Sequence, residues 1–133
     1  MKATFNGTES EFHIARKNIN YLESSLGRGL YDVLKDFTDG KWTFRDVAMV
    51  VSFALHGPNK ADKLVIDNAL QAIRLGLGTA AVGTALGHFA RSYSPHPGVI
   101  EVLERDGHGN YAGLAADILT YTIFGETNAD EAA

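Results

Sequence analysis

The sequence contains no cysteine. This absence excludes a disulfide framework, a thiolate metal site and a cysteine nucleophile. It fits a reducing cytosol, where structural disulfides are rare. A strong excess of either charge is also missing, because 12 basic and 16 acidic residues leave a net charge of only −4. Such a chain lacks the basic footprint that binding to nucleic acid or to an anionic membrane requires, so we expect neither as a partner.

Long hydrophobic runs are missing as well. The most apolar stretch, residues 75–89, contains four glycines and His88 and is too short to span a bilayer. The first residues do not show the basic and then apolar pattern of a secretion signal. These features predict a soluble, cytoplasmic protein.

What is present is the composition of an ordinary globular domain, with 45% hydrophobic and 21% charged residues. A chain of 133 residues is expected to form one domain and to bury roughly two-thirds of its unfolded surface. We predict that this domain spans residues 1–125 and that the acidic residues 126–133 form a flexible tail.

Residues 1–15 are predicted to form a β-hairpin. Asn6-Gly7 is a preferred two-residue turn because both residues tolerate positive φ. Pairing of Phe5 with Thr8 places alternate residues on one face, which should pack on the helices because an isolated hairpin is only marginally stable. That face consists of Met1, Ala3, Phe5, Thr8, Ser10, Phe12 and Ile14.

Residues 42–58 carry the strongest helical signals, and we interpret them as the central helix of a small bundle. Thr43 is a good N-cap, and Asp46 stands three residues on, where its carboxylate can close a capping box. Nearly all the following residues are apolar, so this helix should be covered on most sides. Gly57, as a left-handed cap, and Pro58 end it.

Apolar residues at helical spacing predict further helices on both sides of this segment. The last helix is expected to have Asn110 as its N-cap and to end at Gly125. The fold class is therefore mainly α: a small helical bundle of about five to seven helices with an N-terminal β-hairpin. The flanking helices are placed at about residues 18–26, 29–37, 59–76, 79–93, 98–105 and 110–125.

Motifs that would carry catalysis are weak. Residues 76–83 resemble a phosphate loop only in their glycines, because no Lys-Ser/Thr pair follows the last of them. Residues 104–115 begin like a calcium loop, but Ala115 stands where the bidentate acidic ligand belongs. The five histidines lack metal-binding spacing, and there is no Gly-x-Ser-x-Gly elbow. We predict no catalytic residue, no metal site and no cofactor, and hence no enzyme.

Two further features are interpreted as structural. Asp32 and Asp36 share a helical face with Lys35, which is typical of a solvated surface. His56 stands beside the C-terminal cap of the central helix, where a protonated imidazole is a favourable partner for the helix dipole.

Three of the predicted helical segments resemble helices of the small phage tail assembly chaperones, in particular the branch found beside gene transfer agents and related siphophage tails. After the hairpin, residues 19–34 resemble the leucine-glutamate … glycine helix of that family. Residues 46–57 are similar to its next helix, which closes with an aliphatic residue and glycine. Residues 115–125 are similar to its closing helix, which ends in glycine before an acidic tail.

The resemblance covers roughly residues 3–57 and 97–126, whereas residues 60–95 are longer and richer in glycine than the family pattern. It implies a non-catalytic function. Such proteins bind the tape measure protein, a long helix-rich chain, before the tail polymerises, keep its apolar stripes from aggregating and help to recruit tail tube subunits. We therefore expect a phage or prophage protein that acts in the cytoplasm of the bacterial host, with these two proteins as partners.

Holding an amphipathic helix requires an apolar surface with a polar rim. We place the candidate partner-binding groove between the two middle helices, although the same residues could instead complete the core. The residues of this candidate groove are Leu70, Ile73, Leu77, Val82, Leu86 and Phe89.

Two alternative functions stay open. The first is a structural tail or head–tail connector component that remains in the particle. The second is a small metal-dependent hydrolase that uses His88, His96 or His108. Self-association into a homo-oligomer is open as well.

Overall fold

The computed structural model describes residues 1–59, 71 and 93–125. These residues form a two-stranded antiparallel sheet, five α-helices and one 3-10 helix, which confirms the predicted mainly helical fold with an N-terminal hairpin. The elements are β1 (Lys2–Phe5), β2 (Thr8–Glu11), α1 (Arg16–Leu26), α2 (Leu30–Asp39), α3 (Phe44–His56), α6 (Pro97–Asp106), η1 (His108–Tyr111) and α7 (Ala112–Phe124).

The hairpin has the predicted turn and register. Asn6 and Gly7 have φ of 55° and 74°, and Phe5 pairs with Thr8. Phe5 is buried, as are Phe12 and Ile14 beyond the second strand. Thr8 is exposed although it was expected on the packed face, because it borders an open pocket rather than the core.

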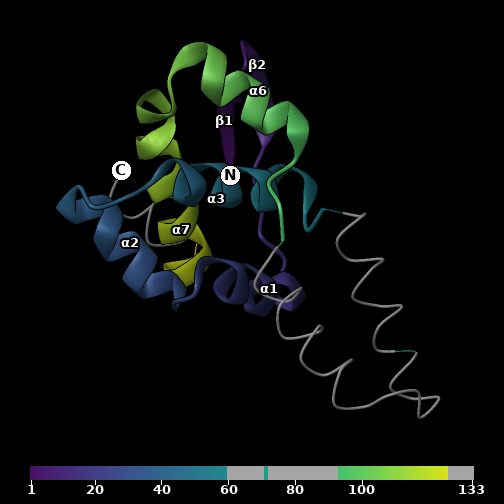
Figure 1. The fold of residues 1–133 in the computed structure, drawn as a ribbon, viewed down its shortest axis with the longest axis vertical. Helices are drawn as coiled ribbons and strands as arrows, with labels where there is room; N and C mark the ends of the chain where they lie inside the picture. Colours follow the sequence, from purple (N-terminus) through teal and green to yellow (C-terminus); the bar gives the residue numbers. More distant parts are fainter. Residues whose placement is uncertain (60–70, 72–92, 126–133) are drawn as a thin grey trace.

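Helix α3 is the centre of the described body. It crosses the middle of the molecule, with α1 and α2 on one side and α6 and the hairpin on the other (Figure 1), and it contacts α1, α6, α7 and β2. Nine consecutive residues, 46–54, are buried. The prediction that this helix is covered on most sides is therefore confirmed.

Both ends of α3 follow local rules, although one differs from the prediction. Thr43 and Asp46 form the capping box, with each side chain accepting the other residue's backbone N–H. Gly57 ends the helix with φ of 74°, but its ψ of −166° lies outside the left-handed helical region, so the predicted left-handed cap is wrong. The residue before a proline is disfavoured in helical conformations and favoured in extended ones, and Pro58 follows here.

Two other helix starts differ from the prediction. Helix α1 begins at Arg16, two residues earlier than expected. Asn110 is not the N-cap of α7, because its side chain donates to the carbonyl of Asp106 (2.6 Å) and closes the turn after α6. Helix α7 continues directly from η1, with Tyr111 at the N-cap position and no side-chain cap.

The helices predicted over residues 59–76 and 79–93, and the tail at 126–133, lie almost wholly outside the described residues. Tyr93 is described, and it is fully buried with its ring against those of Tyr21 and Phe53. Within the described part of the chain, no helix combines the length and the hydropathy that a membrane crossing needs.

Candidate functional site

The predicted partner-binding groove cannot be located in the described part of the molecule. All six of its residues, Leu70, Ile73, Leu77, Val82, Leu86 and Phe89, lie outside the described residues. That groove stays a prediction.

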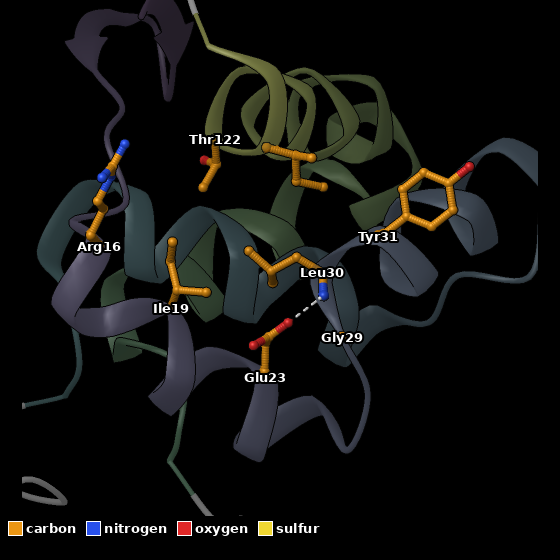
Figure 2. A pocket seen from close by; sticks show the side chains of 8 residues that line it. Arg16, Ile19, Glu23, Gly29, Leu30, Tyr31 and Thr122 are labelled. Carbon is orange, nitrogen blue, oxygen red and sulfur yellow. Dashed lines mark hydrogen bonds between the residues drawn. The ribbon is translucent and has the colours of Figure 1, made fainter.

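A different groove is formed by α1, α2 and the end of α7 (Figure 2). Its volume is about 430 Å³. Leu30 forms a buried floor, and Ile19 and Ile123 contribute partly exposed apolar surface. Two chain segments about ninety positions apart, α1–α2 and α7, therefore build one apolar surface.

A polar contact inside this groove joins α1 to the start of α2. Gly29 occupies the N-cap position of α2 and provides no side chain to cap the helix. Glu23 of α1 replaces that cap, because its Oε2 accepts the backbone N–H of Leu30 (2.8 Å, Figure 2). A Cβ on residue 29 would lie 3.3 Å from this oxygen, so the absence of a side chain lets the carboxylate approach. The groove is preformed by these contacts.

The most exposed large hydrophobic side chain among the described residues lines this groove. Tyr31 lines it and is 64% exposed. Phe124 follows the groove residue Ile123 at the end of α7 and is 49% exposed. Exposed apolar side chains that gather in one place often mark a binding surface, and Tyr31 here adjoins the partly exposed Ile19 and Ile123 of the same groove.

The polar end of the groove is formed by the start of α1. Arg16 lines it, and Figure 2 shows this side chain at the opposite end from Tyr31. The first turn of α1 contains Arg16 and Lys17, no acidic residue and no side-chain cap. Each cation in a first helical turn is unfavourable by about 0.3–1 kcal/mol, because the N-terminal end of the helix dipole is positive. Within the described residues, Arg16 forms no ion pair that would offset this cost.

A second pocket of about 350 Å³ lies between the hairpin, the end of α3 and the start of α6. His56 and His96 stack there, with ring centroids 4.1 Å apart. The backbone N–H of His96 donates to Ser52 Oγ (2.7 Å), and Nδ1 of His96 accepts the N–H of Gly98 (3.1 Å) as the N-cap of α6. The pair therefore joins α3 to α6.

The electrostatics of this pair favour a neutral His56. Partial desolvation lowers the pKa of His56, although this residue is exposed, and the neighbouring His96 lowers it further. Both effects oppose the protonation that would strengthen an interaction of His56 with the α3 dipole, and the predicted partnership with that dipole stays a prediction. The pairing was missed because the two residues are forty positions apart. The available signal was Pro97, since a proline at the first helical position makes residue 96 the N-cap.

Arg28 joins three elements from the short loop between α1 and α2. Its guanidinium donates to Asp36 on α2 (2.9 Å), to Asp46 on α3 (2.8 Å) and to the carbonyl of Leu26 (3.2 Å). The hydrogen bond with Asp46 is the main cause that raises the pKa of Arg28, and Asp36 adds to it. Asp36, interpreted from the sequence as part of a solvated face, is instead ion-paired and two-thirds buried. These charges connect the helices, so their arrangement is structural.

The histidines of the hydrolase alternative are not brought together where they can be located. His96 precedes α6 and His108 follows it, and a ten-residue helix is about 15 Å long. His108 packs against the rings of Trp42 and Phe44, and His88 lies outside the described residues. Across residues 1–59 and 93–125, no three His, Asp or Glu side chains are grouped to hold a metal ion.

The stretch that begins like a calcium loop forms an internal network instead. The carboxylate of Asp106 accepts from Arg105 (2.9 Å) and from the hydroxyl of Tyr111 (2.7 Å). The bond from Arg105, and then that from Tyr111, lowers the pKa of Asp106 to about 2. Its oxygens are thus engaged within the turn.

Of these features, the groove of Figure 2 is the one that combines an exposed aromatic side chain, Tyr31, with a cation, Arg16, that forms no ion pair among the described residues. Comparison of the chain with protein-family models, with curated proteins and with solved structures found no match.

Proposed function

We propose that this protein is a non-catalytic tail assembly chaperone of the phage type, which binds the tape measure protein in the cytoplasm of the host and assists assembly of the tail tube. The observation that carries the proposal is the preformed apolar groove with a polar rim between α1, α2 and α7. A surface of this kind is what holding the apolar stripe of a helix requires.

The distribution of the family resemblance supports the proposal. The segments that carry it, residues 3–57 and 97–126, correspond to the hairpin, α1, α2, α3, α6 and α7. These elements pack into one hydrophobic core around α3. The resembling segments thus share one folded body in the described part of the chain, to which Tyr93 also contributes.

The test is a pull-down of the tagged full chain from cells that also express the neighbouring genes, with mass spectrometry of the proteins that co-purify. Recovery of a long helix-rich chain is the expected result. If the predicted groove outside the described residues takes part, Leu77→Asp and Leu86→Asp will abolish that recovery. A well-folded wild-type chain that recovers no such protein would refute the proposal.

A second measurement separates the chaperone from a structural tail component. A chaperone leaves before the particle is complete, whereas a connector stays. Purified particles should therefore lack this chain. Its presence there at a fixed copy number would assign it to the structural class.

A further inference from the structure

The start of α1 breaks a local rule of helix stability. Two cations, Arg16 and Lys17, occupy its first turn, where acidic residues would be favourable, and Ala15 provides no side-chain cap. Folding of α1 gives no reason for this choice. Residues that break a local rule without a compensating contact are often retained for function.

Arg16 stands where the apolar groove begins. Ile19 and Leu30 follow it along the groove, and Tyr31 lies at the far end (Figure 2). The strip therefore has an aromatic anchor at one end and a cation at the other. Among the described residues that line it, Glu23 is the acidic one, and its carboxylate accepts the backbone N–H of Leu30. Positive charge is therefore offered to a ligand at the Arg16 end of the groove, whereas the negative charge of Glu23 is engaged with the start of α2.

We infer that this groove binds one amphipathic α-helix of another protein, with its apolar face on Ile19, Leu30 and Tyr31 and an acidic residue paired with Arg16. The walls are helices and expose no sheet edge, so the contacts available are those of side chains with a helix rather than of strand addition. Charge complementarity requires an acidic residue beside the apolar face. The inference deepens the proposed function and depends on it only for the name of the partner.

The test uses the full chain and two fluorescent peptides of about 18 residues that are designed to be helical. Both peptides carry leucines at i, i+3, i+4 and i+7. They differ only in the residues at the two ends of the apolar face, which are glutamates in one peptide and lysines in the other. Fluorescence anisotropy measures the binding of each. The wild-type chain should prefer the glutamate peptide, and higher salt should reduce that preference.

The decisive variant is Arg16→Glu. It should weaken binding of the glutamate peptide by about 3–10-fold and tighten binding of the lysine peptide, because an attractive exposed pair becomes a repulsive one. Tyr31→Ala should weaken both peptides about tenfold, since exposed aromatic anchors dominate such interfaces. Lys35→Glu is the matched control: it reverses an exposed charge of α2 that does not line the groove, and it should leave both affinities unchanged.

A merely structural role for Arg16 would make Arg16→Glu less stable than the wild type, whereas the inference predicts no loss of stability. Arg16→Glu improves the electrostatics of the first turn of α1, so the variant should unfold at an equal or higher urea concentration while it loses the glutamate peptide. Equal changes for both peptides, or an effect of Lys35→Glu as large as that of Arg16→Glu, would overturn the inference. A dimer of this chain that Arg16→Glu dissociates in sedimentation would overturn it in favour of a second copy as the occupant.

The peptide experiment tests the groove and the pull-down tests the proposed function, so one can be refuted without the other. A charge swap that behaves as expected, with no tape measure protein recovered from cells, leaves the groove valid and refutes the proposed function. Recovery of the tape measure protein by both wild type and Arg16→Glu, with no charge preference among peptides, leaves the proposed function valid and refutes the groove.

Discussion

Replacement of Arg28 by methionine should destabilise the fold by about 2–3 kcal/mol. Methionine keeps much of the aliphatic length and removes the charge. The bond to Asp46 is the larger loss, because that side chain is 4% exposed and hydrogen bonds to charged groups contribute about 1.5–3 kcal/mol. The pair with Asp36 adds about 0–1 kcal/mol, because that carboxylate is 31% exposed and partly screened by water.

Urea unfolding of the full chain at neutral pH measures this effect. The single tryptophan, Trp42, provides the signal, since its ring stacks on Phe37 in the folded protein. With a slope of about 1–3 kcal/mol per M, the midpoint should fall by about 1–2 M.

Two companion variants test the reasoning. Asp36→Asn should cost less than about 1 kcal/mol, because it removes only the more exposed pair. In a double-mutant cycle, Arg28→Met and Asp46→Asn should show a coupling of about 1 kcal/mol or more. The account of Arg28 as a partly buried connector is refuted if Arg28→Met lies within about 0.5 kcal/mol of wild type, or if Asp36→Asn costs as much as Arg28→Met.

Three further predictions concern single positions. Because the pKa of His56 is lowered in the folded protein, the unfolded chain takes up a proton more readily than the folded one. The free energy of unfolding should therefore fall as the pH drops below the ordinary value of 6.5 and level off below the folded pKa. Urea unfolding at several pH values should show a shallower fall for His56→Gln, and an unchanged profile would contradict this. Gly113→Ala should raise stability by about 0.5–1 kcal/mol, because this helical glycine has open space around it. Gly107→Ala should lower stability by about 1–2 kcal/mol, because residue 107 has a φ of +87°. Thermal melting should show a higher melting temperature for the first variant and a lower one for the second. Met49→Ala should cost about 2–5 kcal/mol, because the side chain is fully buried in α3, and a value under about 1 kcal/mol would show that the core refills the cavity.

Much of the fold could be predicted because its signals act over a few residues. The Asn6-Gly7 turn, the Thr43 capping box and Pro97 at the first position of α6 each depend on neighbours in the chain. Apolar residues at helical spacing likewise indicate a helix wherever it packs. The prediction of a left-handed cap at Gly57 was wrong because Pro58 was taken only as a helix stop, whereas a proline also disfavours helical conformations in the residue before it.

The groove, the stacked histidines and the Arg28 network depended on the tertiary structure instead. Arg28 and Asp46 are eighteen positions apart, His56 and His96 are forty, and the groove joins α1 and α2 to α7. Periodicity indicates that a helix has a buried face, but not which helix will cover it or which charges will then meet. Which helix covers that face, and which charges then meet, depends on how the described helices pack around α3. Contacts between residues far apart in the sequence form only when their segments have come together.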